Sequence, residues 1–279
     1  MLGSILLIKN MIRSQILIPL LLVANCLIAQ DRKDKDKALE IAQKAIGLMD
    51  EGEIDESIKL LKEAEKLDPD RIDYPYEIAY AHYLKQDYEE AIKVAERTLG
   101  HKNVIDRVYQ ILGSLYDIQG DPDKAIETYK MGMDKFPNSG KLYLEAGVVE
   151  NSRENYNEAI VYWETGIKAE PNYSSNYYWL AKTFARTDEL IWSILYAEIF
   201  IDLELGSERT EEISKLLYEN YQNSYVQDTD STADKIWMFI RSLMKKPYRK
   251  LRLVKESPLQ LKHYGMVTHK DGFWSCSLL

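Results

Sequence analysis

Histidine, a common metal ligand and catalytic residue, is rare and scattered in this sequence. The four histidines are His82, His101, His263 and His269. The last two are six residues apart, a spacing that does not place a zinc pair on one helical face. The histidines therefore predict no metal site and no catalytic pair.

A second candidate for chemistry is an acidic run in which aspartates alternate with other residues, as in a calcium-binding loop. Its aspartates are Asp228, Asp230 and Asp234. Thr232 replaces one ligand, Ala233 stands where the loop needs glycine, and Phe239 stands where it needs a bidentate glutamate. We therefore interpret this run as a solvated linker.

Other catalytic and phosphate-binding patterns are also missing from the sequence. It contains no HExxH, GxSxG, Walker or GxGxxG pattern, and its 13 glycines are nowhere clustered into a phosphate-binding loop. We expect no catalytic residue, no cofactor and no metal ion, and thus a protein that is not an enzyme.

The composition is that of a folded, helical protein. The 279 residues are 46% hydrophobic and 29% charged, with 8 prolines and 20 tyrosines. This balance favours packed helices and argues against a turn-rich all-β fold. The net charge of −9 argues against nucleic-acid binding by the whole chain.

Large and small residues recur with a period of 34. One unit contains Tyr109, Leu112, Gly113, Tyr116, Gly120, Ala125, Tyr129, Gly132 and Pro137. The next contains Tyr143, Ala146, Gly147, Glu150, Ala159, Trp163, Gly166 and Pro171. Each unit predicts two amphipathic helices, with small residues where the helices meet and proline just past the second.

These residues resemble the tetratricopeptide repeat family over five units, from about residue 38 to residue 207, after which the period fails. The resemblance implies an all-α fold, a right-handed α-solenoid of stacked antiparallel helix pairs. It also implies a non-enzymatic scaffold that binds a peptide or extended protein segment in a concave groove. His82 lies at a core position of the repeat, so we predict a packed, hydrogen-bonded histidine there.

By the geometry of the family, thirteen residues face the groove. They are Tyr76, Tyr80, Tyr83, Arg107, Gln110, Ser114, Asp117, Lys141, Asn151, Ser152, Tyr178, Lys182 and Arg186. The tyrosines at one end and the cations at the other predict a site for an acidic or carboxylate-ended segment, although the tyrosines could instead pack between helices. The lysine–asparagine clamp that some relatives use for chaperone tails is not matched, because Ala42 and Ile46 stand there.

The N-terminal residues 1–29 have the order of a secretory signal peptide. Lys9 and Arg13 precede an apolar run that ends at Ala29, and charged sequence follows. We expect cleavage after Ala29 and a secreted, periplasmic or cell-envelope protein. The alternatives are an uncleaved anchor and a lipoprotein acylated at Cys26. After cleavage only Cys276 remains, so no intrachain disulfide is expected.

The C-terminal part differs from the repeats. Residues 208–225 predict a capping helix, residues 227–234 a polar linker and residues 236–244 a short helix. Between residues 235 and 262, nine lysines or arginines face one acid. We divide the chain into a signal peptide (1–29), a solenoid with its capping helix (38–225) and a basic tail (226–279). The tail suggests an alternative function, a membrane-associated regulatory or adaptor subunit of an envelope enzyme or secretion system.

Overall fold

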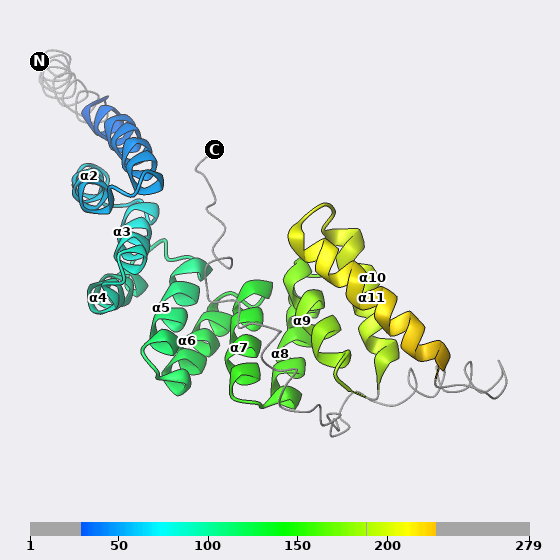
Figure 1. Cartoon of the computed structure of the whole chain (residues 1–279). Helices are drawn as coiled ribbons and strands as arrows, with labels where there is room; N and C mark the ends of the chain where they lie inside the picture. Colours follow the sequence, from blue (N-terminus) through cyan, green and yellow to red (C-terminus); the bar gives the residue numbers. More distant parts are fainter. Residues whose placement is uncertain (1–28, 188, 227–279) are drawn as a thin grey trace, which may run out of the picture. The chain divides into compact units, whose positions relative to one another are not determined.

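The computed structural model describes residues 29–187 and 189–226, and every regular element in these ranges is an α-helix (Figure 1). The predicted all-α class is therefore confirmed. The chain divides into two compact units, Met1–Val104 and Ile105–Leu279. The first contains a helix of residues 29–50, α2 (Ile54–Leu67), α3 (Asp73–Leu84) and α4 (Tyr88–Leu99). The second contains α5 (Asp106–Ile118), α6 (Pro122–Lys135), α7 (Gly140–Ser152), α8 (Tyr156–Ala169), α9 (Ser174–Phe184), α10 (Leu190–Leu203) and α11 (Glu208–Val226).

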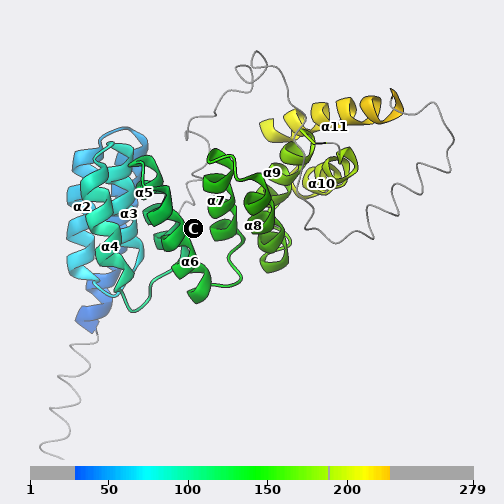
Figure 2. The same cartoon turned by 90° about the horizontal axis from the view of Figure 1, so that it is seen from below.

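Alanines let the helices of the first unit approach closely. Ala38, Ala42 and Ala45 recur at intervals of four and three, so they lie on one face of the helix of residues 29–50. All three are buried, and they share a core with Ile58 and Leu61 of α2 and with buried residues of α3. Figure 2 shows α2, α3 and α4 side by side in this unit.

The helices of the second unit repeat at the constant interval found in the sequence. The first helices of successive pairs, α5, α7 and α9, begin one repeat period apart, and so do the second helices, α6, α8 and α10. Each first helix packs on its own second helix, and the first helices also pack directly on one another. The pairs therefore stack with their first helices in one layer.

Helix contacts within a pair match small residues with large ones. A β-carbon built on Gly113 would lie 2.3 Å from Cε1 of Tyr129, and one built on Gly147 would lie 2.2 Å from Nε1 of Trp163. Both aromatic rings are almost completely buried. The glycines are therefore required by the aromatic rings opposite them.

The turn between the two helices of a pair needs a left-handed residue at a fixed position of the repeat. This position is occupied by Gly52, Gln86, Gly120 and Glu154, which have φ of 86°, 62°, 81° and 63°. Glycine adopts this conformation freely, whereas glutamine and glutamate carry a β-carbon that disfavours it. Two of these four turns are therefore strained.

Helix α11 continues the period that fades in the sequence after Ser207. It begins at Glu208, one repeat period after the start of α9 at Ser174, and packs on α9 and α10 (Figure 1). It lies where we expected the capping helix and occupies the place of the first helix of a sixth pair, although the residue signature of the repeat fails there. Lys215 stands where earlier first helices have Gly113 and Gly147, and it is exposed because the described residues include no second helix of the same pair to pack on it.

A buried polar link joins α11 to the last pair. Asn220 Nδ2 donates to Ser193 Oγ at 2.7 Å, and Ser193 Oγ donates to the backbone oxygen of Ala181 at 2.6 Å. Ser193 occupies the position that Ala125 and Ala159 occupy in the earlier second helices. Serine therefore stands in place of alanine in α10, the second helix that has Asn220 of α11 as a hydrogen-bond partner.

Candidate functional site

The candidate binding face of the second unit is built on α5, α7 and α9, which lie side by side (Figure 1). Because these helices begin at intervals of one repeat period, equivalent side chains form rows across them. Arg107, Lys141 and Ser175 form one such row, and Ser114, Val148 and Lys182 form another. The repeat period therefore positions the predicted groove residues.

The amide and hydroxyl groups of this face bond mainly within the protein. Gln110 Nε2 donates to Glu145 Oε1 on the next first helix at 2.8 Å. Ser114 is buried, donates to the backbone oxygen of Gln110 and lies 3.1 Å from the hydroxyl of Tyr129. The structure thus assigns Ser114 to helix packing, which corrects its predicted role as a groove surface residue.

Of the predicted groove cations Lys141, Lys182 and Arg186, the two lysines already have acidic partners. Lys141 Nζ lies 3.8 Å from Asp106 Oδ2, and Lys182 Nζ lies 2.7 Å from Glu212 Oε1. Arg186 instead stacks on an aromatic ring, with its guanidinium carbon 5.5 Å from the ring centre of Tyr156. The predicted cluster of cations is therefore partly neutralised by carboxylates of the same chain.

Tyr178 is a buried structural residue. Only 7% of its surface is exposed, and its hydroxyl donates to Glu212 Oε2 at 2.6 Å while it accepts from Lys182 Nζ at 2.9 Å. Burial, and then the hydrogen bond to Glu212, raise the pKa of the Tyr178 hydroxyl above its ordinary value. Tyr178 therefore fixes Lys182 and Glu212, in place of the partner contact that we predicted.

The remaining predicted positions of the second unit differ in accessibility. Arg107, Asp117 and Asn151 are half-buried, whereas Ser152 is exposed and donates to the backbone oxygen of Val148 at 3.0 Å. These side chains lie near both ends of the first helices. Their exposure leaves these four positions as candidate contacts.

Three of the predicted tyrosines, Tyr76, Tyr80 and Tyr83, belong to the first unit, and the last two take part in an aromatic stack. The rings of Tyr80 and Tyr83 have centres 6.0 Å apart and planes 15° apart, and Tyr88 lies 6.2 Å from Tyr83. Tyr80 and Tyr83 are half-buried, but Tyr76 is only 4% exposed. The structure therefore leaves Tyr80 and Tyr83 as candidate contacts and corrects the prediction for Tyr76.

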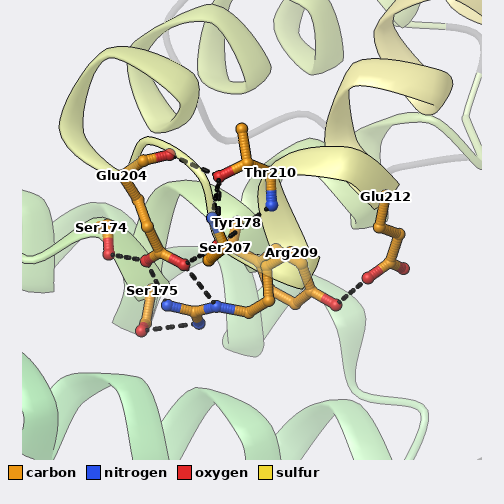
Figure 3. A network of polar contacts seen from close by, with 8 residues as sticks. All are labelled: Ser174, Ser175, Tyr178, Glu204, Ser207, Arg209, Thr210 and Glu212. Atoms are coloured by element: carbon orange, nitrogen blue, oxygen red, sulfur yellow. Dashed lines mark hydrogen bonds and ion pairs between the residues drawn. The ribbon is translucent and has the colours of Figure 1, made fainter.

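Sequence reasoning missed a polar network that joins α9 to the start of α11 (Figure 3). Glu204 is its centre, because its carboxylate accepts from Ser174 Oγ at 2.7 Å, from Ser207 Oγ at 2.6 Å and from the guanidinium of Arg209. Arg209 also donates to Ser175 Oγ at 3.0 Å. Burial alone would raise the pKa of Glu204, but the bonds from Arg209, Ser207 and Ser174 lower it.

The recurrence of glutamate at one repeat position could have indicated this network from the sequence. Glu170 precedes Glu204 by one repeat period, and each accepts a hydrogen bond from the first residue of a helix 30 residues earlier. The donor to Glu170 is the backbone nitrogen of Gly140 at 2.8 Å, and the donor to Glu204 is Ser174 Oγ. A glutamate that follows the second helix thus serves as a recurring clamp.

The predictions about chemistry can be compared with the described residues. His82 is buried, and its Nδ1 lies 3.2 Å from Asp87 Oδ2, so the predicted core histidine is confirmed. Among the described side chains, no group of three or more potential ligands could hold a metal ion. None of the described helices is both long and apolar enough to span a membrane. The aspartates near residue 230 and residues 1–28 of the predicted leader lie outside the described residues.

Comparisons with known proteins agree with the helical architecture. Residues 42–103 and 106–130 match the tetratricopeptide repeat family. The BBSome complex member BBS4 of Bos taurus is 31% identical over 121 residues, which are 40% of this chain and 23% of that protein. The Hsp70-Hsp90 organizing protein of Triticum aestivum is 27% identical over 155 residues, which are 52% of this chain and 26% of that protein. This chain therefore matches less than a third of either relative.

A solved tetratricopeptide-repeat protein of Thermus thermophilus shares the fold with a TM-score of 0.53 and 14% identity. The match covers 65% of this chain and 99% of that protein. At this identity the likeness concerns the fold alone. Residues 42–130 of this chain therefore carry tetratricopeptide repeats, within an all-helical fold of the tetratricopeptide solenoid type.

Proposed function

We propose that this protein is a non-enzymatic scaffold that binds an extended segment of another protein along α5, α7 and α9. The observation that carries the proposal is the layer of first helices, across which the half-buried polar side chains of Arg107, Lys141 and Ser175 form a row. An extended peptide laid across the layer would contact each helix in turn. The two relatives named above also support it, because one is named as a member of a complex and the other as an organiser of two chaperones.

The ligand that suits this face carries carboxylates. Arg186 contacts Tyr156 and, within the described chain, forms no ion pair. Lys182 lies in the last turn of α9 and Arg186 lies two residues past its end, so both cations can meet one acidic segment or chain end. Binding there would exchange the contact between Lys182 and Glu212 for a contact with the ligand. The arginine is the stronger anchor, because a guanidinium binds carboxylates in a bidentate manner.

A peptide-binding experiment tests this function. The full chain and the double variant Lys182→Gln and Arg186→Gln are compared against immobilised peptides with acidic, neutral and basic sequences. We expect wild-type protein to prefer acidic peptides and the double variant to bind them about tenfold or more weakly, a loss of about 1.4 kcal/mol or more. The matched control is Lys130→Gln with Lys168→Gln, which removes two exposed charges from the second helices α6 and α8.

Two outcomes would exclude this proposal. The first is equal binding of acidic and basic peptides by the wild type. The second is equal loss of binding in the double variant and in the control, because the effect would then reflect net charge. A melting temperature is measured for each variant, and we expect it to stay near the wild-type value since Tyr178 still donates to Glu212.

We further propose that the protein is exported and acts in the cell envelope. The support is the sequence order of charge, apolar run and small residue that ends at Ala29. Mass determination of the native N-terminus tests it, with Gln30 as the expected first residue. An acylated Cys26 would instead indicate lipid anchoring, and a retained Met1 would refute export.

A further inference from the structure

The outward face of the second helices changes along the second unit from charged to apolar. One row of this face has the same register in each helix, with members four residues apart. In α6 it is Asp123, Glu127, Met131 and Lys135, and in α8 it is Asn157, Val161, Thr165 and Ala169. In α10 it is Ile191, Leu195, Ile199 and Leu203. We call these four residues of α10 the apolar row.

The apolar row is accessible in the described structure. Ile199 and Leu203 are 42% and 38% exposed, and Ile191 and Leu195 are half-buried. Leu205, just beyond the helix, is 79% exposed at the position where the preceding pairs have proline. Single exposed apolar residues are ordinary, but a contiguous row along a whole helix marks a contact surface. We therefore expect another segment or molecule to cover the apolar row.

The charges around the row restrict what that occupant can be. Helix α10 contains Glu198 and Asp202 and neither lysine nor arginine. An anionic lipid surface would be repelled by these carboxylates, whereas an apolar helix with basic flanks would be attracted. The occupant should thus be amphipathic and positively charged.

The chain itself contains such a segment outside the described residues. Residues 235–246 contain seven apolar residues, four basic residues and no acidic residue. At 100° per residue, Ile236, Phe239, Ile240 and Leu243 fall on one side of a helix, and Arg241 and Lys245 fall on the other. The basic side would face solvent and the acidic margins of α10.

The linker allows the segment to reach the row. Asn220 of α11 bonds to Ser193 near the start of α10, and α11 ends at Val226, about 9 Å further along its axis. The eight residues from 227 to 234 can extend over about 26–29 Å. A twelve-residue helix is about 18 Å long, which equals the length of the apolar row.

We propose that residues 235–246 form an amphipathic helix that packs on the apolar row of α10 in the same chain. The second unit then ends with a helix supplied by the tail, and the outward face of α10 is covered. The docked helix also fixes the start of the remaining basic tail next to α10.

Hydrogen exchange on the full-length protein tests this proposal. In the wild type, we expect amides of residues 236–244 to exchange at least about tenfold more slowly than an unstructured chain. The variant Ile199→Lys places a cation in the row, opposite the basic segment, and should remove this protection. The matched control is Val161→Lys on α8, because Val161 is 41% exposed and lies outside the row. It should leave the protection unchanged.

Three results would overturn the proposal. Unprotected amides in residues 236–244 of the wild type would show that the segment does not dock. Protection that rises with protein concentration, together with a dimeric mass in light scattering, would assign the row to a second copy of the chain. Protection that requires anionic vesicles would assign the segment to a lipid surface. Helical content and melting of Ile199→Lys are recorded in parallel. We expect the helical content to fall by no more than the tail helix contributes, because Ile199 is 42% exposed among the described helices and they do not depend on it.

Discussion

The contact between Gly147 and Trp163 offers a sharp test of the packing within a helix pair. The perturbation is Gly147→Ala, which adds one methyl group in the middle of α7. The new β-carbon would lie 2.2 Å from Nε1, 2.5 Å from Cδ1 and 2.7 Å from Cε2 of the Trp163 indole. Each distance is far below van der Waals contact. The ring is fully buried and its Nε1 donates to the backbone oxygen of Leu144 at 3.2 Å, so it cannot move aside freely.

The expected loss of stability combines two opposing effects. Overpacking of a tight core costs about 1–3 kcal/mol, and a lost buried hydrogen bond costs about 1 kcal/mol more. Replacement of glycine by alanine within a helix stabilises the folded state by about 0.5–1 kcal/mol, which offsets part of this cost. We therefore expect Gly147→Ala to lower the free energy of unfolding by about 1–3 kcal/mol. For a unit of this size, each kcal/mol corresponds to about 2–4 °C in melting temperature.

The assay is urea and thermal unfolding followed by far-ultraviolet circular dichroism. The control is Gly47→Ala, because Gly47 is exposed in the helix of residues 29–50 and a β-carbon there meets no atom within 4 Å. It should stabilise the protein by about 0.5–1 kcal/mol. In the background Trp163→Phe, which removes the nearest nitrogen, Gly147→Ala should cost less than it does in the wild type. A Gly147→Ala protein as stable as Gly47→Ala would refute the close-contact argument.

Three further predictions concern the turn, the buried polar link and the titrating carboxylates. Glu154→Gly should stabilise the protein by about 0.5–1 kcal/mol in urea unfolding, because relief of a left-handed residue outweighs the added flexibility of the unfolded chain. Ser193→Ala should cost about 1–3 kcal/mol in the same assay, because Asn220 loses its acceptor; an unchanged midpoint would contradict the link. The folded pKa of Glu204 is lowered, so its stabilisation is complete above the unfolded pKa and is lost as pH falls through the folded pKa. Burial raises the pKa of Glu164, so its charged form destabilises the fold as pH rises. Melting curves at pH 7 should therefore show that Glu204→Gln lowers the free energy of unfolding by about 1–3 kcal/mol. Glu164→Gln should not lower it, because the glutamine side chain remains a hydrogen-bond acceptor.

The sequence predicted those parts of the fold that local spacing determines. The repeat period predicted the helix pairs, and the small residues Gly113 and Gly147 predicted the tight contacts within them. The period also placed His82 in the core. In each case the physical cause is contact between neighbouring helices, which recurs in every unit and therefore leaves a repeated pattern.

Other features could not be predicted, because they depend on what a residue meets in space. Gln86 and Glu154 occupy the left-handed position that glycine occupies in other repeats, and neither residue type indicates this conformation in the sequence. The partner of Lys182 was missed as well, because Glu212 belongs to a helix whose sequence has lost the repeat signature. Helix α11 lost that signature for a physical reason. Among the described residues, α11 has no second helix of its own pair, so it has no need for a small residue at position 215.

The neutralised cations change how the candidate face would choose its ligand. A carboxylate arriving at Lys182 replaces Glu212, so one ion pair is exchanged for another and little free energy is gained there. Arg186 has no ion pair to give up in the described chain, so contact with a ligand carboxylate adds a new interaction. Selectivity for an acidic segment should therefore depend more on Arg186 than on Lys182. It should also weaken with salt, since both cations lie at a solvated surface.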